Sequence, residues 1–329
     1  MLWEEEVIPL DKQQPPYKLV LAHHRSPGDS LVLSAALRSL HLTYPGEYQV
    51  ALDVTAGTEL YQHNPDVTHV GLDRAQAAFH QIEYDQIHQS NQTPVTFMAA
   101  FCWHLGQIIG RPLELKTNRP HIVLGDEEKL WCSQVQEILG KPTKFAVVNA
   151  GTKRDYTVKG WGHQNYQNLI NRTRDRIQWV QVGTPNELHR PLDGVIDLIG
   201  KTSIRQLIRL VYHAEFCVGP TTLLQHIAAA LERPYVAILS GMEPLSWSSP
   251  YPTQISLSTH GRLPCCRTQA CWRSRVVPLG DTTPAEASLC HMPVSIGKEI
   301  IPACMSAVTV DRVAEAVEQV MTYGRIRLA

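Results

Sequence analysis

The sequence predicts an α/β protein made of two Rossmann-like domains that face one another, each with a parallel sheet. Its 329 residues exceed the size at which a single hydrophobic core usually stops growing. In both halves, short apolar strand patterns alternate with helical patterns, which is typical of parallel sheets. The composition, 43% hydrophobic and 19% charged, is that of an ordinary globular chain and excludes a disordered or fibrous protein.

The first half opens with a strand, a turn and a helix. Residues 17–24 (YKLVLAHH) form an apolar run that ends at the turn 26–28 (SPG), and Asp29 and Ser30 follow as N-cap candidates for a helix through Leu40. Further strands are predicted at 48–54, 69–72 and 121–124, and further helices at 95–109 and 126–139. Because 140–142 (GKP) breaks this pattern, we expect an N-terminal domain at 1–141.

The cycle then restarts in the second half. Strands are predicted at 145–149, 177–183, 215–218 and 235–239, and helices at 163–174, 203–212, 222–231 and 309–321. After residue 240 the regular pattern gives way to a Pro- and Cys-rich section. We therefore expect a C-terminal domain at 142–308, with the Cys-rich section at 261–305, followed by a helix within 309–329.

Charge and apolar patterning restrict the partners and the location. Thirty Lys and Arg against 31 Asp and Glu give a net charge of -1, which argues against nucleic acid or an anionic membrane as a partner. The N-terminus is acidic, lacks the basic segment of a signal peptide, and no apolar run is long enough to span a membrane. We expect a cytoplasmic protein, in which clustered cysteines bind metal or do redox chemistry rather than form structural disulfides.

Five of the eight cysteines lie in one short C-terminal stretch. They are Cys265, Cys266, Cys271, Cys290 and Cys304. Their spacing matches no standard zinc finger, so the spacing alone leaves two equal alternatives. One is a four-thiolate site for zinc or iron, and the other is a set of unrelated buried thiols.

Three segments are candidates for chemistry. The first is the turn at Asp29, whose carboxylate lies at the carboxyl end of a strand and can accept a proton from a bound hydroxyl. Capping the helix is the more frequent role of an Asp at such a position. The second is 149–161 (NAGTKRDYTVKGW), where a small-residue turn lies beside Lys153, Arg154 and Lys159, as a diphosphate site requires. A solvated surface loop is an equal alternative for this segment.

The third segment is 217–231 (CVGPTTLLQHIAAAL). Pro220 ends a strand, Thr221 or Thr222 can cap the next helix, and the free amides of its first turn form an anion site. His226 lies four residues after Thr222 and can reach the same ligand, although a lone histidine there is more often structural. Neither GxGxxG, a Walker motif nor GxSxG is present, which argues against a dehydrogenase, a P-loop protein and a serine hydrolase.

Taken together, these segments resemble glycosyltransferase family nine, the ADP-heptose heptosyltransferases. The run VGPTTLLQHIAAALERPYVAIL, with GKTSIRQL before it and SGMEPLSWSSPYP after it, is similar to the nucleotide-sugar-binding half of that family. NAGTKRDYTVKGWGHQNYQNLI resembles its phosphate-contacting segment, and SPGDSLVLSAAL resembles its acceptor loop. The resemblance implies a GT-B type fold, with the acceptor in the N-terminal half and the donor, ADP-heptose, in the C-terminal half.

The resemblance also implies roles for single residues. Asp29 would be the general base of an inverting transfer, Lys159 and Thr152 would hold the donor phosphates, and Lys159 would also act in catalysis by stabilising the leaving group. The residues placed at the donor are Thr152, Lys153, Lys201, Pro220, Thr221, Thr222, Leu223, His226 and Glu243. The chain departs from the family where Asp-Thr-Gly is replaced by Thr-Thr-Leu at 221–223, which removes a carboxylate and a glycine at the donor.

The Cys-rich section is similar to a metal-binding insertion in the branch of this family that glycosylates bacterial autotransporter proteins. The resemblance implies structural iron or zinc on Cys266, Cys271, Cys290 and Cys304, with Cys265 as the alternative ligand, and no catalytic metal. The expected partners are a nucleotide-sugar donor and an acceptor that is a glycan or a protein Ser or Thr. A homo-oligomer is compatible with the sequence. Two alternatives are a nucleotide-sugar epimerase of the same fold and a noncatalytic metal-binding scaffold.

Overall fold

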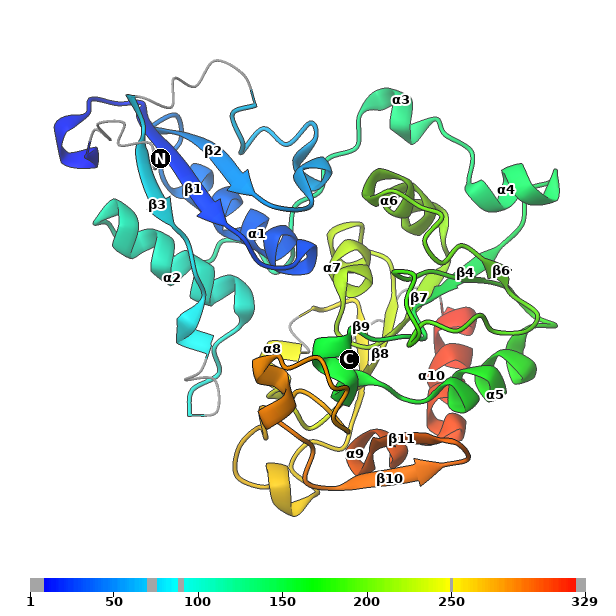
Figure 1. The fold of residues 1–329 in the computed structure, drawn as a ribbon. Coiled ribbons are helices and arrows are strands. Elements are labelled where there is room, and N and C mark those ends of the chain that lie inside the picture. Colours follow the sequence, from blue (N-terminus) through cyan, green and yellow to red (C-terminus); the bar gives the residue numbers. More distant parts are fainter. Residues whose placement is uncertain (1–8, 70–75, 88–91, 249–250, 324–329) are drawn as a thin grey trace. The chain divides into compact units, whose positions relative to one another are not determined.

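The chain folds into two compact α/β units in the computed structural model, which describes residues 9–69, 76–87, 92–248 and 251–323 (Figure 1). The N-terminal unit comprises Met1–Ser90 and Val95–Lys129, and the C-terminal unit comprises Asn91–Pro94 and Leu130–Ala329. Each unit has a parallel sheet of its own, which confirms the predicted fold class. Over the described ranges, no helix has the length and apolar character needed to cross a membrane.

The N-terminal unit is built on a three-stranded sheet in the order β2-β1-β3. Its strands are β1 (Tyr17–His23), β2 (Tyr48–Val54) and β3 (Ala78–Gln81), and its long helices are α1 (Pro27–Thr43) and α2 (Phe97–Ile109). The central strand β1 is buried from Leu19 to its end, because both neighbours and the helices cover it. This burial explains the continuous apolar run in its sequence.

Three predictions between residues 26 and 139 are wrong in detail. The N-cap of α1 is Ser26 and not Asp29 or Ser30, because Pro27 starts the helix and is favoured at its first position. Residues 121–124 form no strand, and the helix predicted at 126–139 is two short ones, α3 (Asp126–Lys129) and α4 (Gln134–Leu139). A new cap causes that break, since the Ser133 hydroxyl accepts a hydrogen bond from the Gln136 amide (3.0 Å). Except for residue 69, the strand predicted at 69–72 lies outside the described residues.

The C-terminal unit has a six-stranded parallel sheet in the order β6-β5-β4-β7-β8-β9. The strands are β4 (Phe145–Val148), β5 (Gln178–Gln181), β6 (Ile196–Asp197), β7 (Phe216–Gly219), β8 (Tyr235–Leu239) and β9 (Gln254–Ser258). Numbered from one in chain order, this is the order 3-2-1-4-5-6 of doubly wound dinucleotide-binding sheets. The strand order reverses between β4 and β7, and ligands of such sheets bind at that point.

Helices complete the C-terminal unit. The longer ones are α5 (His163–Thr173), α6 (Ile204–His213), α7 (Leu223–Ala230) and α10 (Val310–Tyr323). Trp161, Trp179 and Phe216 are fully buried in one core with residues of α5 and α10. The Trp161 indole donates to the Val308 carbonyl (2.6 Å), which fixes the approach to α10.

The remaining elements are short. They are the 3-10 helices η1 (Leu10–Lys12), η2 (Thr58–Tyr61), η5 (Arg154–Lys159), η6 (Pro264–Cys266) and η7 (Pro284–Ala287), the helices α8 (Leu245–Ser248) and α9 (Ala303–Ser306), and the antiparallel strands β10 (Pro293–Ile296) and β11 (Glu299–Pro302). Most of the Cys-rich section is therefore loop, with a single hairpin near its end.

Candidate functional site

The loops that carry most of the predicted donor residues follow β4, β7 and β8, which are neighbours in the C-terminal sheet. Because the strands are parallel, their carboxyl ends lie at one edge, and the reversal of strand order falls between β4 and β7. Gly219 lets the loops after β4 and β7 approach closely, since a Cβ there would lie 3.1 Å from the Asn149 carbonyl oxygen. The fold thus gathers separate sequence motifs at the ligand-binding edge of the sheet.

Lys159 is the residue at which the three loops meet. Its ammonium nitrogen lies 2.5 Å from Oε1 of Glu243, in the loop after β8, and donates to the carbonyl of Thr221, after β7, at 3.5 Å. The side chains of Lys159 and Glu243 are only 19% and 4% exposed. Such shielding from water strengthens the attraction between the two charges and holds the ammonium group in one place.

The start of α7 lies beside this ion pair. Thr222, one of the two predicted candidates, is the N-cap, although its hydroxyl makes no capping hydrogen bond, and Leu223 opens the helix. The carbonyl of Pro220 accepts a hydrogen bond from the Tyr235 hydroxyl (2.7 Å), which anchors the turn before the helix. The amides of the first turn and the helix dipole favour an anion at this end.

His226 is buried on α7, and its Nδ1 lies 2.7 Å from the hydroxyl of Tyr251. Burial lowers the pKa of His226 to about 3, and the nearby charge of Lys159 acts in the same direction. At neutral pH this imidazole is therefore uncharged. It contributes a hydrogen-bonding ring to the site and no positive charge.

The other predicted donor residues are spread more widely. Thr152 lies next to the end of the η5 loop, with its methyl group 3.6 Å from the Cβ position of Gly160. Lys153 is exposed. Lys201 follows the edge strand β6 and donates to the carboxylate of Asp197 (3.0 Å) and to its carbonyl (2.9 Å). Among the described residues, neither Lys153 nor Lys201 therefore forms a hydrogen bond or ion pair with Lys159 or Glu243.

The basic stretch between residues 153 and 176 has six Lys or Arg, which do not form one patch. They are Lys153, Arg154, Lys159, Arg172, Arg174 and Arg176. Arg172 and Arg176 lie on or just after α5 and pair with Asp311 and Glu318 of α10. Only the first part of the stretch lies in the loop after β4. The basic residues of this stretch thus belong partly to the loop after β4 and partly to the ordinary surface of a helix pair.

Asp29 lies at the start of α1, half-buried. Its Oδ2 accepts hydrogen bonds from the amide of Ser26 (3.3 Å) and from the hydroxyl of Tyr84 (3.2 Å). Burial and the adjacent Asp29 carboxylate raise the pKa of Tyr84, so its hydroxyl stays a donor. Arg25 covers the ring of Tyr84, 4.9 Å from its centre, and pairs with Glu83 (2.9 Å).

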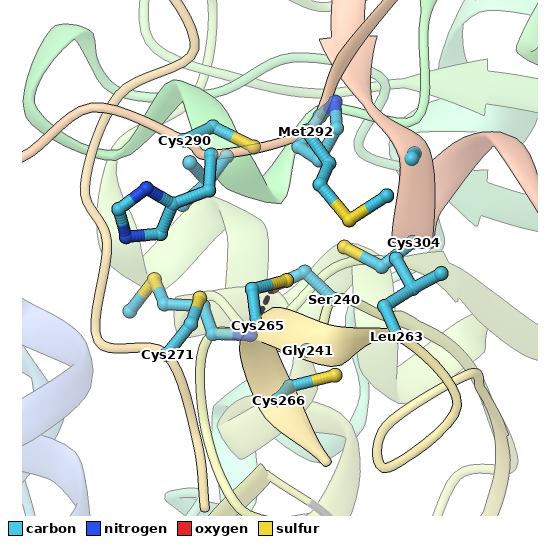
Figure 2. A pocket seen from close by; sticks show the side chains of 14 residues that line it. Ser240, Gly241, Leu263, Cys265, Cys266, Cys271, Cys290, Met292 and Cys304 are labelled. Carbon is cyan, nitrogen blue, oxygen red and sulfur yellow. Dashed lines mark hydrogen bonds between the residues drawn. The ribbon is translucent and has the colours of Figure 1, made fainter.

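All five clustered cysteines line one small cavity of the C-terminal unit, together with Ser240, Gly241 and Met292 (Figure 2). Its volume is about 20 Å³, enough for a single water molecule or ion. Gly241 lets Cys266 approach, because a Cβ there would lie 2.9 Å from the sulfur. Burial raises the pKa of Cys304 to about 12 and also raises those of Cys271 and Cys290, so these groups are neutral thiols when no cation is bound.

The four cysteines predicted to bind metal thus line one cavity, but their sulfur atoms are not arranged as a metal site. They are Cys266, Cys271, Cys290 and Cys304. In the described part of the chain, no three His, Cys, Asp or Glu side chains are arranged to hold a metal ion. The chemistry of the donors nevertheless fits thiolate-binding metals, and the cavity fits one ion. A metal would have to draw the sulfur atoms together and displace their protons.

The structure adds contacts that the sequence patterns had not indicated. Tyr84 contacts Asp29, Tyr251 contacts His226, and Tyr235 anchors Pro220. These tyrosines are far from their partners in the chain, so no local sequence spacing predicts the contacts.

Comparison with known proteins identifies the family. The model of glycosyltransferase family 9 (heptosyltransferase) matches residues 67–272. No curated protein sequence matches this chain. Among solved structures, the family 9 glycosyltransferase of Veillonella parvula DSM 2008 is similar, with a TM-score of 0.57 and 12% identity over 76% of this chain and 87% of that one.

Two Escherichia coli structures are similar over more of the chain. ADP-heptose lps heptosyltransferase II has a TM-score of 0.56 and 14% identity, covering 93% of this chain and 98% of its own. TibC of enterotoxigenic E. coli H10407, described as an iron-containing dodecameric glycosyltransferase, has a TM-score of 0.58 and 15% identity, covering 96% and 78%. At such identities the likeness shows a shared GT-B type fold. Because the family model spans more than half of the chain, the protein belongs to glycosyltransferase family 9 (heptosyltransferase) and is a glycosyltransferase.

Proposed function

We propose that this enzyme transfers heptose from ADP-heptose to an acceptor hydroxyl, with inversion at the anomeric carbon. One arrangement carries the proposal: Lys159, Glu243 and the first turn of α7 meet where the strand order reverses. The choice of donor is supported by the family and by a structure of TibC in complex with ADP-D-beta-D-heptose, which has a TM-score of 0.59 and 14% identity.

In this proposal the diphosphate lies between Lys159 and the amides at the start of α7. The ammonium group and the helix dipole are fixed positive charges, so they stabilise the charge that develops on the departing ADP. Thr152, Lys153, Thr221 and Thr222 line the approach to the phosphates. Glu243 holds the ammonium group in place, and its carboxylate also accepts hydrogen bonds from donor hydroxyls.

Asp29 acts as the general base. The acceptor oxygen attacks the anomeric carbon, its proton passes to Asp29, and the bond between that carbon and the phosphate oxygen breaks with its electron pair leaving on ADP. Both observed hydrogen bonds of this carboxylate go to Oδ2. Within the described ranges Oδ1 has no hydrogen bond, so it is the oxygen proposed to take the proton.

We further propose that the Cys-rich section holds structural iron or zinc on four of its five cysteines. Support comes from the shared cavity, the donor chemistry and the description of TibC as iron-containing. A bound ion would cross-link a section that is mostly loop, and no step of sugar transfer passes through it. A homo-oligomer is proposed by analogy with dodecameric TibC. The cytoplasmic location stays a prediction.

The test is a donor screen combined with metal analysis of the purified full chain. ADP-heptose is offered with a lipopolysaccharide core oligosaccharide or with a Ser- and Thr-rich protein, and ADP release and the anomeric configuration of the product are measured. We expect release only with an acceptor, an inverted product, and about one iron or zinc per chain. Isomerised sugar nucleotide without acceptor would indicate the epimerase instead, and no binding of ADP- or UDP-sugars would indicate the scaffold.

A further inference from the structure

One stretch of the Cys-rich section, 271–276 (CWRSRV), binds the loops on both sides of the Lys159–Glu243 pair. On the side of Glu243, the amide of Cys271 donates to the carbonyl of Gly241 (3.2 Å), and the amide of Trp272 donates to that of Met242 (3.1 Å). These carbonyls belong to the two residues that immediately precede Glu243. The stretch therefore fixes the backbone that carries the carboxylate.

On the other side, the same stretch binds the end of η5. The amide of Val158 donates to the carbonyl of Ser274 (3.2 Å), and the amide of Val276 donates to the hydroxyl of Thr157 (2.9 Å). Val158, Met242 and Val276 also form a small buried apolar cluster. Both members of the ion pair thus follow directly after residues that the stretch holds.

Arg275 belongs to this stretch, and no part of its side chain is exposed. Within its own section it binds the carboxylates of Asp281 (2.6 and 2.7 Å) and Glu286 and the hydroxyl of Thr283 (2.9 Å). Two carboxylates already neutralise the guanidinium charge. Arg275 nevertheless donates to a third carboxylate, Asp155 of η5, at 3.3 Å.

We infer that Arg275 is a positioning residue for the donor site. By holding Asp155 it orients η5, so that Lys159 stays against Glu243 at the start of α7. This inference rests on the proposed function, since it treats Lys159 as a ligand of the donor phosphates. On this view the Cys-rich section raises the affinity for the donor, although none of its residues contacts the donor.

The alternative is that Arg275 only fastens its own section together. Asp155 separates the two possibilities, because its side chain is 60% exposed, and exposed ion pairs contribute little to stability. Asp155→Asn should therefore leave the fold intact. Asp311→Asn is the matched control, since this carboxylate is 72% exposed and pairs with Arg172 on another face of the same unit.

The experiment is calorimetric titration of the full chain with ADP. We expect Asp155→Asn to weaken ADP binding about fivefold, while Asp311→Asn stays within about twofold of the wild type. Both variants should melt near the wild-type temperature. In a Lys159→Gln background, Asp155→Asn should change the ADP affinity less than about twofold. The reason is that η5 then carries no ammonium group whose position depends on its orientation. A purely structural role does not predict this loss of effect.

Arg275→Lys is a second variant, which keeps the positive charge but loses the planar five-donor fork that reaches all of these partners, and we expect it to weaken ADP binding at least as much. If Arg275→Lys fails to fold, the ADP affinities of the Asp155→Asn variants test the inference. The inference is overturned if Asp155→Asn binds ADP like the wild type, or if it weakens binding equally in the Lys159→Gln background. A wild type that binds no ADP at all would overturn the proposed donor site as well, so the two failures are distinguishable.

Discussion

Asp29 and Lys159, the proposed base and the proposed phosphate ligand, are held in place in different ways. Asp29 is held at its own helix start by a capping box with Ser26, three residues away, and by one long-range hydrogen bond from Tyr84. Lys159 is fixed by partners distant in the chain, since the Thr221 carbonyl that it binds lies 62 positions further on. The position of the proposed base is therefore set in part by a local motif, while the proposed phosphate site is assembled from the loops after three strands of the C-terminal unit.

This difference agrees with the tasks proposed for the two residues. A general base must exchange its proton with an acceptor that comes and goes. A half-buried carboxylate, one of whose oxygens has no hydrogen bond from any described residue, is suitable. A phosphate ligand must offer fixed charge in a place that excludes water, where electrostatic stabilisation is strongest. The 19% exposure of the Lys159 side chain and its contacts with two other loops meet that requirement.

The largest expected effect comes from removing the proposed base. Asp29→Asn should reduce kcat for heptose transfer about 10²- to 10⁴-fold, because the amide cannot take the proton. ADP affinity should stay within about twofold, since the proposed donor site belongs to the other unit. The assay pairs ADP release with ADP titration. Tyr84→Phe, which removes one hydrogen bond but keeps the carboxylate, should cost less. Parallel loss of ADP binding in Asp29→Asn would assign the residue a structural role only.

Removing the ammonium group should have the next largest effect. Lys159→Gln should weaken ADP binding about 10- to 100-fold, because a charge-assisted contact to the diphosphate is lost. Lys144→Gln, an exposed lysine before β4 at the opposite end of the strand, is the control and should bind ADP normally.

A double variant separates binding from folding. Lys159→Gln leaves Glu243 as a buried carboxylate without its counter-charge, so the single variant should also lose about 3 kcal/mol of stability. Adding Glu243→Gln should restore the melting temperature but not the ADP affinity. Restored affinity in the double variant would mean that Lys159 serves only to neutralise Glu243.

The sequence predicted the fold best where local signals decide it. The strand at 235–239 agrees residue for residue with β8, and Ser203, where a helix was expected to begin, is the N-cap of α6. Residues 121–124 show the opposite case: they are as apolar as a buried strand, but a strand exists only where a partner strand pairs with it. The edge strands β6 and β9 were missed because partners, rather than periodicity, define them.

The site was predictable only in part, for the same reason. Strand order places the loops after β4 and β7 at one edge, and the clustered cysteines do share one cavity. No spacing, however, indicates that Lys159 pairs with Glu243 or that Arg275 reaches Asp155, because these contacts arise only on folding. The same limit explains the basic stretch, where Arg172 and Arg176 turned toward α10.

The smallest expected effect concerns acid stability, in which the two units should behave alike. Burial lowers the pKa of His23 in the N-terminal unit and lowers that of His226 in the C-terminal unit to about 3. In the unfolded chain a histidine titrates near pH 6.5. Above that pH neither state binds the proton, so these histidines do not make the free energy of unfolding depend on pH. As the pH falls from 6.5 toward 3, only the unfolded chain takes up the proton at His226, so stability falls with falling pH.

For His226 alone this amounts to about 2 kcal/mol between pH 7 and pH 5. His226→Gln should therefore lose less stability over that interval than the wild type, with His163→Gln as a control that removes another imidazole from the same unit. Urea unfolding followed by tryptophan fluorescence is suitable, because Trp161 and Trp179 are fully buried in the C-terminal core. An acid dependence in His226→Gln equal to that of the wild type would mean that this histidine is protonated in the folded unit as easily as in the unfolded chain. The site beside Lys159 would then be open to water, and the contrast with the half-buried Asp29 would be lost.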